Sequence, residues 1–225
     1  MPLHLPGLYA VTPDGLSTSA LLDRVEQSLS AGVRLLQYRA KPANAAGMRL
    51  QAEAAHLIAV ACRAAGARLI VNDDPALAAR IGADGVHLGR DDGTVADARA
   101  HVGDALVGVS CYDSLEHAMQ AEAEGADYVA FGAMFPSHVK PAAVRASHEL
   151  LGRARAQLRV PIVAIGGIDL GNAAGVLRAG ADSLAVISAL YGAPDIGAAV
   201  RAFNELTENE LRMRPAAAPS GTHHP

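Results

Sequence analysis

Short apolar runs alternate with longer stretches of helical periodicity along almost the whole chain of 225 residues, and this alternation limits the fold more than any other feature. Nearly all of the short runs are continuously apolar, which is typical of parallel strands covered on both faces. Residues that favour turns separate these runs from the helical stretches. We therefore predict eight strands, at residues 8–12, 34–38, 68–71, 85–88, 106–110, 128–132, 161–165 and 183–187.

Helix signals fill the segments between these strands. Residues 17–31 and 43–65 place apolar side chains three and four positions apart, as one face of a helix requires. The predicted helix N-caps are Asp74 before Pro75, Thr94 in a capping box with Asp97, Ser114 before residues 115–124, and Asp169 or Gly171 before residues 172–179. Four phrases, AGVRLLQYR, IGADGVHLG, EGADYVAFG and AGADSLAVI, are alike, because each ends a helix at a glycine and then begins a strand.

Eight successive strand–helix units most simply close into a single (β/α)8 TIM barrel. An open, doubly wound sheet is the alternative, but such a sheet normally has a glycine-rich first turn of the form G-x-G-x-x-G. The first turn here, VTPDGLS, lacks that pattern. The predicted barrel domain spans residues 1–207. Residues 208–225 lose periodicity and become rich in Pro, Ala and Gly, so a disordered tail is predicted there.

Charge and composition argue against a nucleic-acid-binding, membrane-spanning or secreted protein. The net charge is −4 and the chain has no run of Lys or Arg, which argues against a nucleic-acid-binding surface. No apolar stretch is long enough to span a membrane, and the N-terminus MPLHLPGLYAV does not resemble a secretion signal. We expect a soluble cytoplasmic protein. Its two cysteines, Cys62 and Cys111, lie far apart and suggest no disulfide, and Cys62 is interpreted as a small buried hydrophobe.

In such a barrel the chemistry gathers just after the C-terminal ends of the strands. The strand at 34–38 runs into Gln37-Tyr38-Arg39-Ala40-Lys41, where strand alternation points Gln37, Arg39 and Lys41 the same way. An amide and two cations would then converge at the barrel mouth. A solvated strand end is the plainer alternative for this feature taken alone.

Acidic residues follow the next two strands. Asp74 already caps a helix, which leaves Asn72 and Asp73 for a cation or a polar substrate. Asp92 follows the strand at 85–88, where Thr94 caps the helix without its help. Mg²⁺ often takes one or two protein carboxylates and completes its shell with water and substrate phosphates. The sequence therefore offers a candidate Mg²⁺ pair, although acidic pairs are also common on ordinary loops.

The remaining strand ends supply groups that suit phosphate. Ser110 could donate to a phosphate oxygen or tie down its loop, and Cys111 has no evident base beside it. His87 lies within a strand and is interpreted as a packed core histidine. Loops after the seventh and eighth strands, with a short extra helix, form a recurring phosphate site in such barrels. The matching segments here are Gly166-Gly167-Ile168 and Ile187 to Tyr191.

These features predict two anion sites at one mouth. The first combines Arg39, Lys41 and a metal at Asp73 and Asp92, and it suits a diphosphate. The second is the backbone cradle after the seventh and eighth strands, and it suits a monophosphate. Lys140 would lie between them. Two phosphorylated small molecules that meet there would suit a transferase with a diphosphate leaving group.

With these features the chain resembles the thiamine-phosphate synthase (thiamine-phosphate pyrophosphorylase) family over about residues 5–205. The matching segments, in family order and spacing, are QYRAK, VNDDPALAARIGADGVHLGRDD, VGVSCYDSLEHAMQAEAEGADYVAFGAMFPSHVK, PIVAIGGI and AGADSLAVISALY. The resemblance implies condensation of 4-amino-2-methyl-5-hydroxymethylpyrimidine diphosphate with a thiazole phosphate. Thiamine phosphate and pyrophosphate would be the products, Mg²⁺ the cofactor, and dissociative loss of diphosphate the mechanism.

The resemblance also implies residue roles. The pyrimidine diphosphate would be bound by Gln37, Arg39, Lys41, Asn72, Ser110 and Lys140. Asp73 and Asp92 would hold Mg²⁺, with Asp92 preferred to Asp91 because it matches the acid at that offset after GVHLG. The thiazole phosphate would be bound by Ser137, His138, Val139, Gly166, Ile187 and Ser188. Arg39, Lys41 and Lys140 would be catalytic, through stabilisation of the departing diphosphate.

One turn departs from the family. Members usually carry Thr-x-Thr-Lys after the sixth strand, with hydroxyls that face the thiazole phosphate, whereas this chain has Ser137-His138-Val139-Lys140. Val139 cannot donate a hydrogen bond, and one such bond to a charged group contributes about 1.5–3 kcal/mol.

Two other functions are compatible with the sequence. A thiazole tautomerase of the same barrel family would need neither a diphosphate site nor a metal site, and retention of Arg39, Lys41, Asp73 and Asp92 argues against it. A non-catalytic protein that binds thiazole phosphate is the second alternative, which the altered turn allows. The sequence leaves the oligomeric state open, and a homo-oligomer is compatible with it.

Overall fold

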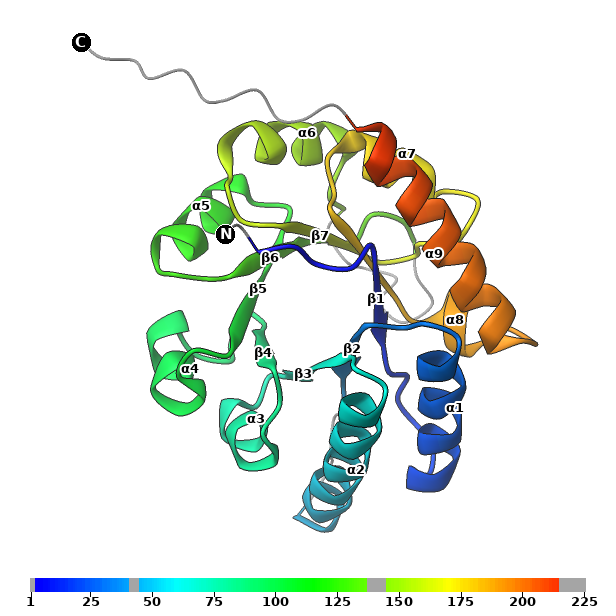
Figure 1. Cartoon of the computed structure of the whole chain (residues 1–225). Helices are drawn as coiled ribbons and strands as arrows, with labels where there is room; N and C mark the ends of the chain where they lie inside the picture. Colours follow the sequence, from blue (N-terminus) through cyan, green and yellow to red (C-terminus); the bar gives the residue numbers. More distant parts are fainter. Residues whose placement is uncertain (1–2, 41–44, 137–144, 215–225) are drawn as a thin grey trace.

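A computed structural model of the chain describes residues 3–40, 45–136 and 145–214. Its strands pair in chain order, β1 to β8, and β8 returns to β1 to close a barrel in which every neighbouring pair is parallel (Figure 1). The strands are β1 Leu8–Val11, β2 Leu35–Tyr38, β3 Arg68–Asn72, β4 Gly85–Leu88, β5 Leu106–Tyr112, β6 Tyr128–Phe131, β7 Ile162–Ile165 and β8 Ser183–Val186. The predicted (β/α)8 barrel and its eight strands are confirmed.

Helices form a ring around the strands (Figure 1). They are α1 Thr18–Ser30, α2 Ala45–Ala64, α3 Pro75–Ile81, α4 Val95–Val102, α5 Leu115–Ala123, α6 His148–Gln157, α7 Ala173–Ala179, α8 Ser188–Tyr191 and α9 Ile196–Met213. The side chains of Asp74, Thr94 and Ser114 cap α3, α4 and α5 as predicted, and Thr94 forms the capping box with Asp97. At α7 the N-cap is Asn172, which makes no side-chain cap bond. Asp169 instead accepts hydrogen bonds from the backbone N–H groups of Gly171 and Asn172.

The buried residues form two apolar layers because strand residues alternate between the two faces of the barrel wall. One layer fills the space between strands and helices, and it contains both cysteines. The other lies inside the barrel and includes Tyr9, Ile70, Tyr128 and Val163. Burial raises the pKa of Cys62 and of Cys111 to about 12, so both thiols stay protonated near neutral pH. This agrees with Cys62 as a buried hydrophobe and gives Cys111 no role as a nucleophile.

Three of the four similar phrases share an aspartate, and the structure explains it. Asp84, Asp127 and Asp182 each stand directly before a strand. Each makes two hydrogen bonds with one residue of the preceding strand in the sequence. The backbone N–H of Asp182 donates to Ile162 O at 2.7 Å, while its carboxylate Oδ2 accepts from Ile162 N at 2.8 Å. Asp84 makes the same pair of bonds with Leu69, and Asp127 makes it with Val107. The repeated Gly-Ala-Asp therefore sets the pairing of neighbouring strands.

We expect Asp182→Ala to lower the free energy of unfolding by about 2 to 3 kcal/mol, the effect of losing hydrogen bonds to a charged group. Asp182 also forms ion pairs with Arg155 and Arg214, which would lose their carboxylate partner. Urea denaturation measures the change. Asp104→Ala, the same substitution at an exposed position, should change stability by less than about 0.5 kcal/mol. Equal effects of the two substitutions would contradict this account of the repeated aspartates.

The predicted end of the domain at residue 207 is wrong. Helix α9 continues to Met213, and Arg214 then donates to Asp182 Oδ1 at 2.8 Å and to the carbonyl oxygen of Leu177 at 2.7 Å. Leu211 lies one helical turn beyond the buried Thr207 and packs against the apolar layer between strands and helices. The buried face of α9 therefore continues past residue 207, where the sequence seems to lose its helical periodicity. The rest of the predicted disordered tail, 215–225, lies outside the described residues.

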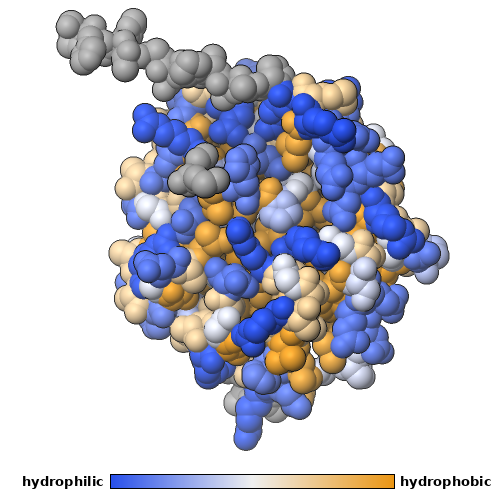
Figure 2. All heavy atoms as spheres, in the orientation of Figure 1, coloured by the Kyte–Doolittle hydropathy of each residue, from blue (hydrophilic) through white to orange (hydrophobic). Residues whose placement is uncertain are grey.

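Hydrophilic residues are interspersed among hydrophobic ones over the face that Figure 2 shows. In the described part of the chain, no helix is both long enough and apolar enough to cross a membrane.

Candidate active site

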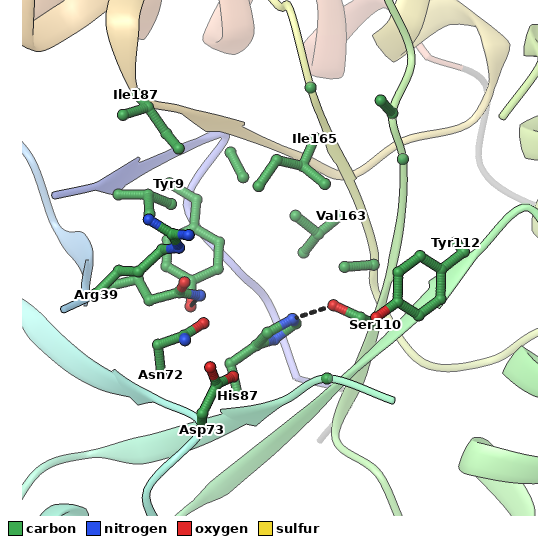
Figure 3. A pocket seen from close by; sticks show the side chains of 18 of the residues that line it. Tyr9, Arg39, Asn72, Asp73, His87, Ser110, Tyr112, Val163, Ile165 and Ile187 are labelled. Atoms are coloured by element: carbon green, nitrogen blue, oxygen red, sulfur yellow. Dashed lines mark hydrogen bonds between the residues drawn. The ribbon is translucent and has the colours of Figure 1, made fainter. Parts of the chain in front are cut away.

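A cavity of about 380 Å³ opens at the C-terminal ends of the strands, and every strand or the loop after it contributes to its lining. Figure 3 shows its two sides. Arg39, Asn72, Asp73 and His87 lie on one side, while Val163, Ile165 and Ile187 lie on the other (Figure 3). The cavity can therefore hold a molecule with a charged part and an apolar or heterocyclic part.

Most of the predicted site residues meet in this cavity. The lining includes Gln37, Arg39, Asn72, Asp73, Asp92, Ser110, Gly166 and Ile187. Ser188 lines a smaller hollow of about 60 Å³, which shares Ile165, Gly166, Ala185 and Ile187 with the main cavity. The predicted residues Lys41, Ser137, His138, Val139 and Lys140 lie outside the described residues, so their roles stay predictions.

Arg39 is held in place from two directions by the end of β1. The fully buried side chain of Thr12 makes two hydrogen bonds with the backbone of Arg39. Thr12 Oγ1 accepts from Arg39 N at 2.8 Å and donates to Arg39 O at 3.1 Å. Asp14, from the loop after β1, forms an ion pair with the Arg39 guanidinium. The Arg39 side chain is only 15% exposed. Burial and two fixed contacts preorganise this cation at the cavity wall.

Asp73 and Asp92 converge on Gly89. A Cβ atom added to Gly89 would lie 2.6 Å from Asp92 Oδ2 and 3.8 Å from Asp73 Oδ1. The backbone N–H of Gly89 donates to Asp92 Oδ2 at 2.8 Å, which fixes the Asp92 carboxylate. Asp73 has a φ of 65°, in the left-handed region, and its backbone N–H donates to His87 O at 2.8 Å. Glycine is needed at position 89 because any side chain would displace the Asp92 carboxylate.

This carboxylate pair is where the sequence predicts Mg²⁺, and the metal there stays a prediction. Among the residues that the structure describes, no group of three or more His, Cys, Asp or Glu side chains could hold a metal. A two-carboxylate site suits a hard cation that keeps water and substrate oxygens in its shell. Asp92 is half-buried and hydrogen-bonded, whereas Asp91 is exposed, which supports Asp92 as the ligand of the two.

A chain of five hydrogen-bonded side chains crosses the floor of the cavity. Gln37 Nε2 donates to Tyr9 Oη at 2.9 Å, and the hydroxyl groups of Tyr9 and Tyr128 lie 3.0 Å apart. Tyr128 Oη lies 3.1 Å from His87 Nδ1. His87 Nε2 lies 2.8 Å from Ser110 Oγ, the contact drawn as a dashed line in Figure 3. Burial lowers the pKa of His87 to about 4, against the opposing effect of Asp92, so its imidazole is neutral near pH 7.

Sequence reasoning missed part of this floor. His87 is buried as predicted, but it also lines the cavity and contacts Ser110, and Tyr9 and Tyr128 were not considered. A tyrosine or histidine within an otherwise apolar strand indicates such a group, because its buried polar atom needs a hydrogen-bond partner. Arg90 was also missed. Its guanidinium lies 4.6 Å from the centre of the Tyr112 ring, and both residues line the cavity.

The smaller hollow is backed by glycine. Gly166 and Gly167 follow β7 with φ values of 102° and 65°, which side-chain-bearing residues rarely adopt. A Cβ atom on Gly166 would lie 2.7 Å from Ala133. The predicted short helix after β8 is confirmed as α8, Ser188–Tyr191. Gly166, Gly167 and Ser188 all line this hollow, where a phosphate cradle is predicted.

Comparisons with known proteins relate the chain to one family. The family model described as "Thiamine monophosphate synthase" matches residues 8–190. The thiamine-phosphate synthase of Methylococcus capsulatus is 51% identical over 221 residues, which cover 96% of this chain and 95% of that protein. That of an Azoarcus species is 56% identical over 193 residues, which cover 85% of this chain and 92% of that protein.

A solved structure shows the same architecture. The thiamine phosphate pyrophosphorylase of Pyrococcus furiosus superposes with a TM-score of 0.82 at 33% identity, covering 92% of this chain and 97% of that one. The match between family model and barrel is thus nearly complete, and close relatives share about half of all residues over almost their full length. The chain belongs to the thiamine-phosphate synthase family of transferases.

Proposed function

We propose that the chain condenses 4-amino-2-methyl-5-hydroxymethylpyrimidine diphosphate with a thiazole phosphate and forms thiamine phosphate and pyrophosphate. One observation carries the proposal: a preorganised arginine and a converging carboxylate pair share a cavity with a glycine-backed hollow. A diphosphate and a monophosphate can therefore be bound within reach of each other. Family membership supports the same assignment.

The diphosphate would lie on the polar side of the cavity. Arg39, fixed by Thr12 and Asp14, is positioned to neutralise its oxygens. Ser110 adds a hydroxyl group and Asn72 an amide at the same side. Lys41 and Lys140 are proposed to add two further cations. Asp73 and Asp92 would hold Mg²⁺, which when bound supplies further neutralisation of the diphosphate charge.

The reaction needs a leaving group and a positioned nucleophile but no covalent bond to the protein. The bond between the pyrimidine methylene carbon and the diphosphate oxygen breaks, and its electron pair leaves with the oxygen. The thiazole nitrogen then forms the new C–N bond with its lone pair. Arg39 stabilises the negative charge that develops on the departing oxygen. The apolar wall of Val163, Ile165 and Ile187 orients the two rings and excludes water from the electron-poor carbon.

The thiazole phosphate would lie against the second hollow. Its phosphate would accept hydrogen bonds from backbone N–H groups near Gly166, Ile187 and Ser188, which line that hollow. Ser137, His138 and Val139 are proposed to contact the same phosphate.

A two-substrate assay tests the proposed function. With both substrates and Mg²⁺, thiamine phosphate and pyrophosphate should accumulate together, and omission of either substrate should abolish both products. Isomerisation of the thiazole carboxylate without pyrophosphate release would instead identify a tautomerase. Tight binding of thiazole phosphate with no product at saturating substrates would identify a binding protein.

Asp92→Ala should raise the Mg²⁺ concentration needed for half-maximal turnover by at least about tenfold, because one of the two proposed carboxylate ligands is lost. A titration with MgCl₂ after removal of divalent metal with EDTA measures this. Asp91→Ala is the matched control, since Asp91 is the adjacent but exposed carboxylate, and its Mg²⁺ requirement should change less than twofold. An unchanged Mg²⁺ requirement in Asp92→Ala would show that the metal is held elsewhere.

A further inference from the structure

A second arginine lines the cavity besides Arg39. Arg39 follows β2 and Arg90 follows β4, so the end of β3, with Asp73, lies between the two cations. Arg39 is largely buried and forms an ion pair with Asp14. Arg90 is exposed, and its guanidinium makes no ion pair or hydrogen bond with the residues that the structure describes. Its positive charge is therefore available to an anion in the cavity.

Tyr112 holds Arg90 through two contacts. The Arg90 guanidinium lies over the Tyr112 ring, 4.6 Å from the ring centre. The backbone N–H of Arg90 donates to Tyr112 Oη at 3.3 Å. The ring attracts the guanidinium to its face, and this contact engages no hydrogen-bond acceptor. The N–H donors of Arg90 are thus held beside the cavity, where they can bind the oxygens of a ligand.

The backbone of Tyr112 supports a role in ligand binding. Tyr112 ends β5, where the pairing of β5 with β6 shifts between Ser110 and Tyr112. Its φ is 55°, in the left-handed region that residues with a side chain seldom adopt. Bulges beside active sites commonly re-aim a side chain, and strained backbone gathers at ligand-binding sites. The fold therefore keeps an unfavourable conformation at the residue whose ring lines the cavity and holds Arg90.

The neighbours of Arg90 favour the diphosphate over the thiazole phosphate as its ligand. Asp92, a proposed Mg²⁺ ligand, lies two positions after Arg90 in the sequence. Figure 3 shows Tyr112 on the same side of the cavity as Ser110 and far from Ile187, which lines the second hollow. Neither Arg90 nor Tyr112 lines that hollow. An anion bound by Arg90 therefore lies on the polar side of the cavity, where the diphosphate is proposed to bind.

The different burial of the two arginines assigns them different ends of a diphosphate. The inner phosphate must lie deep in the cavity, because the carbon that it leaves has to meet the second substrate there. Arg39, with its side chain 15% exposed, suits the inner phosphate. The exposed Arg90 suits the terminal phosphate, which extends towards the cavity mouth. Arginine can bind two oxygens of one phosphate at once.

We propose that Arg90 is a substrate-binding residue for the terminal phosphate of the diphosphate substrate, and that Tyr112 is the positioning residue for its guanidinium. The inference rests on the proposed function, because its ligand is the diphosphate substrate proposed there. The bond that breaks joins the methylene carbon to an oxygen of the inner phosphate, so the terminal phosphate contacts Arg90 equally before and after that step. Arg90 thus binds substrate, transition state and pyrophosphate alike, which lowers KM without raising kcat.

Pyrophosphate with Mg²⁺ is the first probe, because it contains the terminal phosphate and needs no turnover. In calorimetry, Arg90→Gln should bind pyrophosphate at least about tenfold more weakly than the wild type, the effect of losing one hydrogen-bonded charge contact. In steady-state assays it should raise the KM for the aminopyrimidine diphosphate by a similar factor and lower kcat less than about threefold. The KM for thiazole phosphate should change less than about twofold. The proposal is overturned if the wild type binds no pyrophosphate, if Arg90→Gln binds it equally well, or if the loss is confined to kcat.

The role of Tyr112 is tested by separating its ring from its hydroxyl group. Tyr112→Leu removes the ring and should weaken pyrophosphate binding about two- to fivefold, the usual effect of one exposed cation–π contact. Tyr112→Phe keeps the ring and should weaken binding less. In an Arg90→Gln background, Tyr112→Leu should have no further effect, because the cation that the ring positions is gone. An equal effect of Tyr112→Leu with and without Arg90 would show that Tyr112 does not act through Arg90.

The matched control is Arg80→Gln, which also removes one exposed positive charge. Arg80 lies on α3 and does not line the cavity. This variant should keep pyrophosphate affinity within about twofold of the wild type. An equal loss in both arginine variants would indicate a general effect of net charge and would overturn the specific contact.

The inference and the proposed function fail in different ways. Equal pyrophosphate affinity in the wild type and Arg90→Gln, in a protein that forms thiamine phosphate, contradicts the inference alone. Pyrophosphate affinity that depends on Arg90, in a protein that forms no thiamine phosphate, contradicts the proposed function alone.

Discussion

Replacing Arg39 by Gln should lower kcat by about 100- to 1,000-fold, the usual effect of removing one preorganised group that stabilises developing charge. Arg39 is 15% exposed and bound to Thr12 and Asp14, so its charge is fixed before the substrate arrives. The glutamine keeps a polar side chain but loses the charge and the fork of donors. The measurement is pyrophosphate release under saturating substrates and Mg²⁺.

The control for Arg39→Gln is the same substitution at the opposite end of the barrel. Arg68 is exposed at the start of β3, and Arg68→Gln should leave kcat within about twofold of the wild type. Arg39→Lys should recover only part of the activity, because it restores the charge without the planar fork. If Arg39→Gln retained more than a tenth of wild-type kcat while folded, Arg39 would not stabilise the leaving group.

Gly108→Ala should lower the free energy of unfolding by about 3 kcal/mol or more, because overpacking of a closed interior forces side chains or backbone to move. Gly108 is paired with His87 on β4 and with Tyr128 on β6, so it lies beneath the contact between their side chains. A Cβ atom there would lie 2.0 Å from Tyr128 Cζ and 2.4 Å from its hydroxyl oxygen. Urea denaturation gives the change in stability.

Two further variants separate this clash from a general effect of alanine. Gly152 lies in α6, and a Cβ atom there would meet its nearest neighbour at an ordinary 3.6 Å. Gly152→Ala should raise stability by about 0.5–1 kcal/mol, as expected within a helix. In a Tyr128→Leu background, Gly108→Ala should be much less destabilising than in the wild type, since the ring is gone. A loss below about 1 kcal/mol for Gly108→Ala alone would contradict the geometry of the floor.

The sequence predicted the barrel well because its signals are local. Continuous apolar runs locate the strands, and capping residues such as Asp74 and Thr94 locate helix starts through neighbours only three residues away. Gln37, Arg39, Asp73 and Asp92 could also be placed at the mouth. Strand alternation and the common end of parallel strands fix their direction without any knowledge of distant partners.

The remaining parts of the site depend on contacts between distant residues. Asp14 lies 25 residues from Arg39 in sequence, and only the pairing of β1 with β2 brings them together. Tyr9 and Tyr128 are 119 residues apart, and within an apolar strand each looks like one more core residue until barrel closure places their hydroxyl groups together. The predicted domain end at residue 207 falls short for a similar reason, since Arg214 is anchored by Asp182 and by the carbonyl groups of Leu177 and Ala181.

The central claim is that one cavity binds both substrates and transfers the pyrimidinylmethyl group between them. A single-turnover experiment tests it most directly, with enzyme in excess over the aminopyrimidine diphosphate, saturating thiazole phosphate and Mg²⁺, and both products followed in time. The account predicts one thiamine phosphate and one pyrophosphate per diphosphate substrate consumed, formed at the same rate, and a much slower reaction in Arg39→Gln. Binding of both substrates by wild-type protein without formation of thiamine phosphate would contradict it.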